Sequence, residues 1–147
     1  MILISPFSKA LRNGGNNPKN YPSWKEVLKG LNGQEVIQIG VDGEKQLTKD
    51  FRKNLPFKEI EKLIQECDVW VSVDNFLPHM AHHLKKTGIV LFGQSDPNIY
   101  GYPENSNLLK DRKYLRPDQF LMWEQSEYIK DAFVKPEVVL ESIRELV

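Results

Sequence analysis

The stretch from Val69 to Phe92 restricts the fold of this chain more than any other part of its sequence. Val69–Val73 is rich in β-branched and aromatic residues, the composition of a buried strand. A helix is predicted over Leu77–Lys85 with Gly88 ending it, and Ile89–Phe92 is a second apolar strand. Strand, helix and strand in so short a segment form a βαβ unit, whose two strands must run parallel.

The rest of the chain alternates between strands and helices in the same way. Ser23 and Glu26 form a predicted capping box at the start of one helix. The expected elements are strands over Ile2–Ser5, Glu35–Ile39 and Ser106–Leu109; helices over Trp24–Leu31, Pro56–Glu66, Phe120–Lys130 and Glu137–Leu146; a short helix and a weak strand between Glu44 and Asn54; and an extended loop over Gly93–Pro103. This alternation predicts an α/β fold, a three-layer Rossmann-like domain with a mostly parallel sheet that takes in residues 1–147 as a single domain.

Composition excludes several classes of function. The chain has 20 basic and 20 acidic residues, so there is no overall charge to attract nucleic acid or an anionic membrane. No apolar run approaches the roughly 20 residues of a membrane span, and the N-terminal MILIS is too short for a signal peptide. We expect it to be a first strand that begins at the initiator methionine of a whole gene product. The single Cys67 excludes an intrachain disulfide and suits a reducing compartment, so we expect a cytoplasmic protein.

Asp74 and His79 follow the strand Val69–Val73 and are the sharpest pair of candidate site residues. In parallel sheets ligands bind outside the carboxyl ends of the strands, where Asp74 is expected to lie. A carboxylate at this position can cap the following helix, and free N–H groups of the first helical turn can meet a phosphate. The alternative is that Asp74 is only a helix cap, and this alternative is favoured when Asp74 is considered alone.

Lys19 and Glu44 are two further candidates, in separate loops. Lys19 lies in the long polar loop Pro6–Pro22 and can meet a phosphate as a point charge, although a solvated loop lysine is the alternative that the sequence alone favours. Glu44 follows a glycine-rich turn after the second strand, where α/β folds place an acid for a ribose diol. The Gly-x-Gly-x-x-Gly fingerprint is absent, so we expect neither a classical dinucleotide site nor a cofactor.

The three histidines recur at helical spacing, since His79, His82 and His83 stand at i, i+3 and i+4. This spacing is compatible with a metal site, but no HExxH pattern and no paired cysteine or carboxylate accompanies it. We therefore predict an exposed histidine-rich face and no metal. Structural roles are also favoured for the lone cysteine and for the tryptophans, Cys67, Trp24, Trp70 and Trp123.

Six segments carry a family resemblance through their residues and their order. They are ILISPFS, KNYPSW from Lys19, VIQIGVDGE, DNFLPHMAHHL from Asp74, VLFGQSDP and the closing FVKPEVVLESIREL. Together they resemble the C-terminal, nucleotide-sugar-binding half of the family 9 glycosyltransferases, the heptosyltransferase group. The resemblance covers nearly all of the chain and implies one Rossmann-like half of a GT-B enzyme.

The resemblance also implies roles for individual residues. Lys19 would meet a donor phosphate, Glu44 the ribose hydroxyls, and the segment from Asp74 to His79 the diphosphate and the donor sugar. Asn75 and Phe76 stand where the family has Ser/Thr-Gly, and Gly93 belongs to the matching Leu-Phe-Gly loop.

The family's acceptor site and catalytic carboxylate lie in an N-terminal domain for which this chain has no counterpart. We therefore expect a glycosyltransferase-like domain that binds a nucleotide or nucleotide sugar and transfers the sugar only with a partner chain or a second copy, such as a homodimer. The alternative is a catalytically inactive nucleotide-binding or interaction module.

Overall fold

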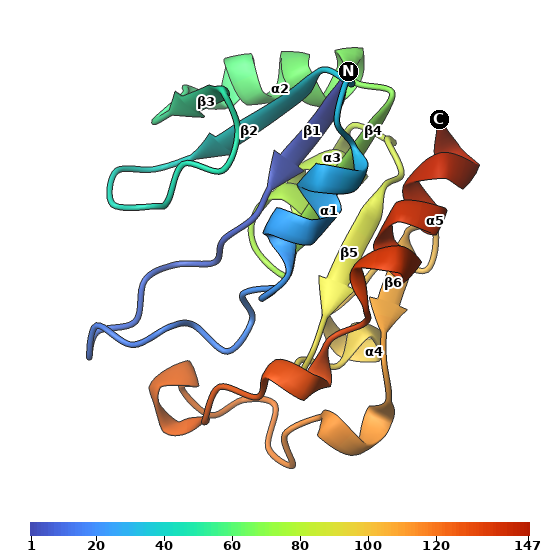
Figure 1. Ribbon diagram of the computed structural model, residues 1–147. Helices are drawn as coiled ribbons and strands as arrows, with labels where there is room; N and C mark the ends of the chain where they lie inside the picture. The colour runs from blue at the N-terminus through green and yellow to red at the C-terminus, as the bar shows by residue number, and fades with distance from the viewer.

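The computed structural model describes residues 1–147 and is built on one six-stranded sheet (Figure 1). The strands are β1 (Ile2–Ser5), β2 (Val36–Gly40), β3 (Asp50–Lys53), β4 (Val69–Val73), β5 (Ile89–Phe92) and β6 (Ser106–Leu109). Their order is β3-β2-β1-β4-β5-β6, and all five neighbouring pairs are parallel. The α/β prediction is confirmed, and the sheet is wholly rather than mostly parallel.

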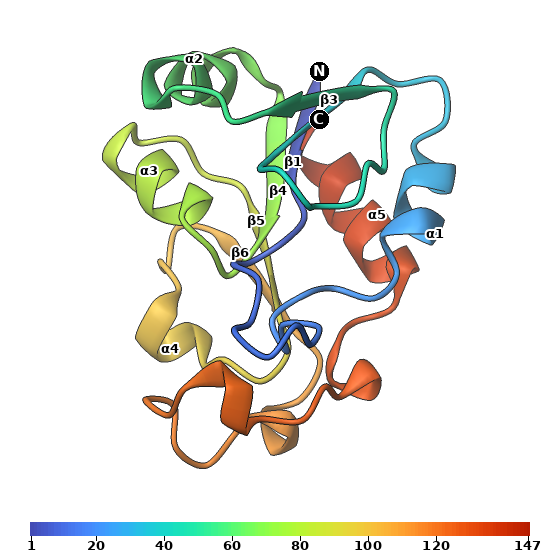
Figure 2. The same cartoon turned by 90° about the vertical axis from the view of Figure 1, so that its left-hand side faces the viewer.

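Helices cover both faces of the sheet and complete three layers (Figure 2). On one face lie α1 (Trp24–Gly30) and α5 (Pro136–Leu146), and on the other lie α2 (Phe57–Glu66), α3 (Leu77–His83) and the short α4 (Pro97–Tyr100). The segment between β6 and α5 contains only 3-10 turns, at Arg112–Tyr114, Trp123–Gln125 and Lys130–Ala132. None of the helices is both long enough and apolar enough to cross a membrane.

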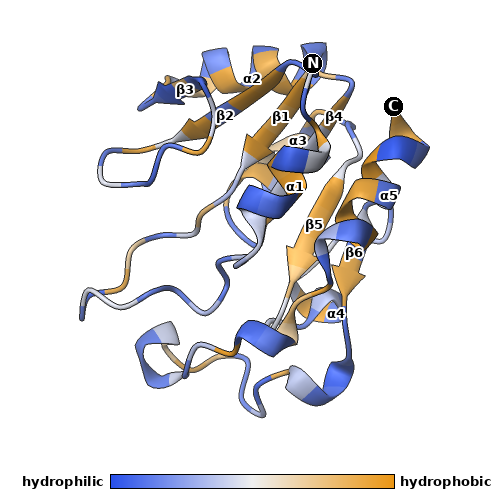
Figure 3. Cartoon of the chain, viewed as in Figure 1, coloured by the Kyte–Doolittle hydropathy of each residue, from blue (hydrophilic) through white to orange (hydrophobic).

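Alternation along β4 shows why both faces of the sheet are apolar. Val69, Val71 and Val73 join the core cluster shared with α1 and α5, whereas Trp70 points to the cluster shared with α2 and α3. Side chains of successive strand residues point to opposite faces, so a mainly apolar strand such as β4 is buried on both sides. Figure 3 shows the consequence: the central strands are hydrophobic along their length, and the helices are hydrophilic on their outer faces.

The strand order reverses between β1 and β4. From β1 the chain proceeds outward to β2 and β3, then returns to the other side of β1 and proceeds outward again through β5 and β6. At such a reversal the loops that leave the two central strands diverge, which opens a crevice at their carboxyl ends. The long loops that follow β1 and β6 both lie at this edge (Figure 1).

The predicted helix over Phe120–Lys130 is wrong, because a buried arginine takes its backbone oxygens. Arg116 is 8% exposed, and its guanidinium donates to the carbonyls of Gln119, Leu121 and Met122. Carbonyls bonded to a side chain in this way are not available for the i to i+4 ladder of a helix. The segment instead wraps around Arg116 as a loop with a 3-10 turn at Trp123–Gln125.

Four smaller predictions also need correction. Ser23 makes no side-chain capping bond, so burial of Trp24 and Val27 anchors α1 instead of a capping box. No helix forms after Glu44, because the Gln38 side chain receives the N–H groups of Leu47 and Thr48 and holds them extended. The predicted loop over residues 93–103 contains α4, whose first turn Asp96 caps. The sequence pattern also predicts that Leu146 faces inward from the last helix, but at the end of α5 this side chain is 45% exposed.

The prediction that Gly88 ends α3 is wrong. Gly88 instead leaves space for a core tryptophan. The helix stops at His83 and Lys85 adopts φ of 57°, before Gly88 is reached. A Cβ atom added to Gly88 would lie 2.2 Å from Cε2 of Trp70, which is fully buried.

We expect Gly88→Ala to lower the free energy of unfolding by about 1–3 kcal/mol, the usual effect of overpacking a core, measured by urea denaturation. Trp70→Phe removes part of the indole, so the double variant should lose less stability than the sum of the two single changes. Wild-type stability for Gly88→Ala would show that the Trp70 ring can move aside.

Candidate functional site

A cleft of about 720 Å³ opens at the carboxyl ends of the first four strands. It is reached by the last residues of β1 and β2, Ser5 and Gly40, and by Asn54 and Asp74, which directly follow β3 and β4. Of the seven predicted site residues, five line this cleft: Lys19, Glu44, Asp74, Asn75 and Phe76.

Lys19 and Asp74 form an ion pair in the centre of the cleft. Lys19 Nζ lies 3.3 Å from Asp74 Oδ2, and the two side chains are 21% and 8% exposed. Asp74 Oδ2 is buried and makes no hydrogen bond within the protein. The reversal of strand order brings the loop after β1 beside the end of β4, so the pair joins residues that are remote in sequence. The result is a largely buried ion pair at the cleft, in which Lys19 is the more exposed partner.

Asn75 closes the junction between β1 and β4. Its amide nitrogen donates to Ser5 Oγ at 2.9 Å, to the Phe7 carbonyl at 3.1 Å and to the Ser5 carbonyl at 3.3 Å. Its oxygen receives the Ser72 hydroxyl at 2.8 Å and the Leu77 N–H at 3.0 Å. The side chain is therefore fully engaged within the protein. Asn75, rather than Asp74, caps α3 by taking the Leu77 N–H.

Glu44 is held against the end of β2. Its carboxylate accepts the Val41 N–H at 2.8 Å. A Cβ atom on Gly40 would lie 2.3 Å from Glu44 Oε1, so only a glycine at this position leaves room for the carboxylate. Burial raises the pKa of Glu44, and the bond from Val41 opposes that rise only in part. A carboxylate that loses solvation in this way gains from any hydroxyl that donates to it.

The other three predicted site residues occupy different surroundings. Phe76 is 44% exposed on the rim of the cleft and has ordinary helical angles, φ −70° and ψ −28°, so this backbone does not require glycine there. His79 lies outside the cleft, with Nδ1 2.7 Å from the Tyr102 hydroxyl. Gly93 is also outside the cleft and lies beneath the Phe133 ring. A Cβ atom added to Gly93 would lie 2.7 Å from Cζ of Phe133.

The loop after β1 contains two buried polar residues that the sequence analysis did not single out. Ser8 donates its hydroxyl to the Asp74 carbonyl at 2.7 Å and so ties the loop to the end of β4. Asn17 receives the Lys19 N–H at 3.0 Å and donates to the Lys9 carbonyl at 2.8 Å. These contacts order the segment that carries Lys19. The loop's length was the only sign of them in the sequence.

The segment after β6 forms the second wall of the cleft. Met122, Trp123 and Glu124 line it, and Lys19 Nζ lies 5.2 Å from the centroid of the Trp123 ring. Trp24 and Trp70 are core residues, as predicted, but Trp123 is half-buried at the cleft. Sequence reasoning missed this wall because Arg116, which builds it, has no distinguishing pattern around it.

The three histidines lie on an exposed surface, as predicted, and are engaged with neighbouring side chains. The imidazole of His82 contacts the Glu104 carboxylate and stacks on Tyr102 at 3.9 Å between ring centroids. No group of three or more histidine, cysteine or acidic side chains is arranged to hold a metal ion. Cys67 is buried, its thiol donates to the Ile64 carbonyl, and burial raises its pKa, which suits an unreactive thiol.

We expect Asn75→Ala to lower the free energy of unfolding by about 2–3 kcal/mol, since it removes a helix cap and leaves buried carbonyls unpaired. Asn13→Ala is the matched control, because Asn13 also receives a backbone N–H two residues ahead but is exposed. Equal stability of the two variants in chemical denaturation would contradict a structural role for Asn75.

Comparison with known proteins identifies the family of this chain. The family model described as "Glycosyltransferase family 9 (heptosyltransferase)" matches residues 13–114, and no curated protein sequence matches. Among solved structures, ADP-heptose LPS heptosyltransferase II of E. coli aligns with a TM-score of 0.69 and 18% identity over 99% of this chain and 45% of its own. The dodecameric iron-containing heptosyltransferase TibC, solved with ADP-D-β-D-heptose, aligns with a TM-score of 0.59 and 15% identity. That alignment covers 91% of this chain and 35% of TibC.

The chain thus spans less than half the length of both solved heptosyltransferases, and at these identities the likeness to them concerns the fold alone. The family model, by contrast, covers most of the chain, including both the Lys19 and the Asp74 segments. This chain belongs to glycosyltransferase family 9.

Proposed function

We propose that residues 1–147 form a single glycosyltransferase domain that binds a nucleotide-sugar donor. The observation that carries the proposal is the convergence of Lys19, Asp74 and Glu44 on one cleft at the carboxyl ends of the strands. Its volume of about 720 Å³ is within the range of small-molecule sites. The family membership and the donor-bound relative TibC support the same ligand class.

Each group has a distinct task in this proposal. Lys19 neutralises the donor's diphosphate, and Asp74 holds Lys19 in position through their ion pair. Glu44 receives the ribose hydroxyls at the neighbouring strand end. The first turn of α3 contributes little to phosphate binding, because Asn75 already takes the Leu77 N–H and Pro78 has none.

Transfer of the sugar needs an acceptor site, which we propose a partner chain or a second copy supplies. Asp74 is tied to Lys19, and Glu44 to the Val41 backbone, so neither is free to act as a base toward an acceptor. The alternative is a module that binds the donor without transferring the sugar. Donor hydrolysis or sugar transfer by the purified protein, alone or with its partner, separates these two functions.

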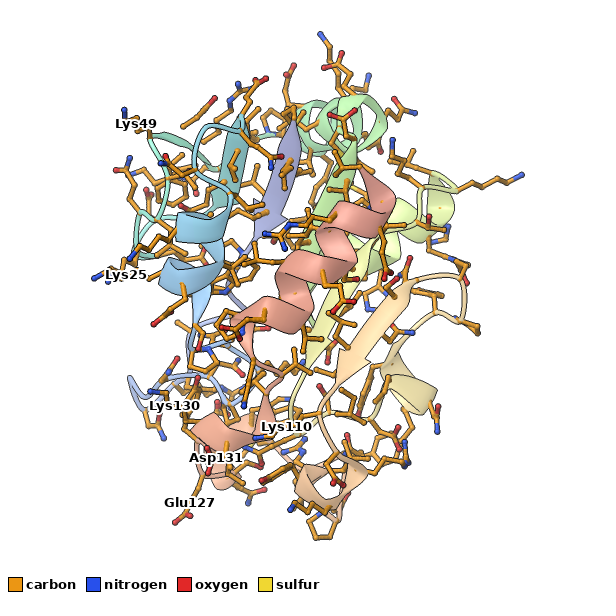
Figure 4. The ribbon with its side chains drawn as sticks, turned by 45° about the vertical axis from the view of Figure 1, so that its right-hand side comes forward. Lys25, Lys49, Lys110, Glu127, Lys130 and Asp131 are labelled. Atoms are coloured by element: carbon orange, nitrogen blue, oxygen red, sulfur yellow. The ribbon has the colours of Figure 1, made fainter.

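We expect Lys19→Ala to weaken binding of a nucleoside diphosphate by 10-fold or more, because it removes the cation of the cleft. Titration calorimetry with ADP, GDP, UDP and CMP measures this and identifies the base. Lys25→Ala is the matched control: it removes the same charge from the outer face of α1 (Figure 4). If none of the nucleotides binds the folded wild-type protein, the proposal is wrong.

Glu44→Gln is expected to change binding and stability in opposite directions. Binding of the same nucleotide should weaken by roughly 1–3 kcal/mol, the scale of a charge-assisted hydrogen bond. Because burial raises the folded-state pKa of Glu44, its ionisation reduces the free energy of unfolding as the pH rises from the unfolded-state pKa through the folded-state pKa. The unliganded variant should therefore equal the wild type below that interval and be more stable at pH 7. Denaturation at both pH values checks the sign.

A further inference from the structure

Trp123 is the aromatic side chain that lines the cleft beside its central cation. Lys19 Nζ lies 5.2 Å from its ring centroid, and the Arg116 guanidinium carbon lies 3.5 Å from it. Both contacts are within the range of cation–π attraction. The remaining surface of the half-buried indole contributes to the cleft wall.

Arg116 fixes the ring as well as contacting it. Its guanidinium donates to the carbonyls of Gln119, Leu121 and Met122 and, at 2.9 Å, to the Ser126 hydroxyl, so bonds are made on both sides of Trp123 in the chain. Burial lowers the pKa of Arg116 below its usual value, which is so high that the group stays charged. The indole is thus held in place in the unliganded protein, and a ligand need not order it.

The wall that carries Trp123 is anchored at the end of β5. The Arg116 N–H and the Gln119 amide both donate to the carbonyl of Gln94, just after β5, and the Gln94 amide donates to the Glu127 carbonyl at 2.7 Å. Glu44, by contrast, follows β2. From β2 to β5 are three strand spacings, about 14 Å, with Lys19 and Asp74 between them.

This order matches the order of groups in a sugar nucleotide. Ribose, diphosphate and sugar follow one another along the ligand, as Glu44, Lys19 and Trp123 follow one another across the cleft. With the ribose at Glu44 and the diphosphate at Lys19, the group on the outer phosphate reaches Trp123. We propose that Trp123 packs against the donor sugar and selects for it, an inference that rests on the proposed function.

The chemistry of the contact fits a sugar. The face of an aromatic ring carries partial negative charge, and the C–H groups on one side of a pyranose carry partial positive charge. Such packing follows the arrangement of hydroxyls, since an axial hydroxyl on that side holds the sugar away from the ring. Trp123 is therefore a specificity-determining residue for the sugar, whereas the diphosphate and ribose bind elsewhere.

The test compares two probes, ADP and ADP-D-β-D-heptose, by titration calorimetry on the full chain. We expect the wild type to bind the sugar nucleotide at least 5-fold more tightly than ADP. Trp123→Ala should lower that ratio to about one, and Trp123→Phe should retain part of it. Because both probes carry the same diphosphate, the ratio cancels any change in the Lys19 contact with ADP. Phe57→Ala is the matched control, because Phe57 is an exposed aromatic residue at the β3 end of the same cleft, and it should leave the ratio unchanged.

Tryptophan fluorescence gives an independent readout. Trp24 and Trp70 are buried, at 3% and 0% exposure, so a change that the heptose adds beyond that of ADP reports Trp123. An unchanged ratio in Trp123→Ala, or equal affinity of the wild type for both probes, overturns the role of Trp123 and leaves the nucleotide site standing. No binding of either probe by the folded wild type overturns the proposed function, and this inference with it.

Discussion

The rest of the site depends on the hydrogen bonds that the Asn75 side chain makes between β1, β4 and α3. Where β1 and β4 end, the loops that leave them diverge, and the sheet offers no strand partner to the carbonyls of Ser5 and Phe7 at this point. The Asn75 amide satisfies these groups and also caps α3, through five hydrogen bonds to three elements. Because unpaired buried carbonyls are costly, this one residue fixes the width of the junction, and with it the position of Asp74.

The cleft keeps charged groups where the fold alone would not favour them. The Asp74 carboxylate is almost fully buried with a single cation beside it, and Glu44 sits in surroundings that raise its pKa. Desolvation of this kind works against the unliganded protein, and hydrogen bonds donated by a polar ligand relieve it. Such groups are characteristic of a site prepared for a polar ligand.

The sequence predicts the fold well, because periodicity and apolar runs record local physics. Val69–Val73 and Ile89–Phe92 are strands at the predicted positions, and the βαβ pattern requires their parallel direction. Contacts between segments that are far apart in the chain leave no comparable pattern in the local sequence. The failed helix near Phe120 and the unrecognised wall at Trp123 share one cause, since both depend on Arg116 and its backbone partners. Likewise, nothing local indicates that His79 turns to Tyr102 or that Gly93 lies under Phe133.

The two walls of the cleft come from opposite ends of the chain and are joined directly. The Tyr128 hydroxyl donates to the Asn20 carbonyl at 2.7 Å, and the Tyr21 hydroxyl donates to the Val134 carbonyl at 2.9 Å. Burial raises the pKa of Tyr128 to about 12, so this donor stays protonated across the physiological range. The loop that carries Lys19 and the segment that carries Trp123 therefore support each other within this chain. Both walls therefore take their shape from contacts within residues 1–147, and the function proposed above requires of a partner only the acceptor side.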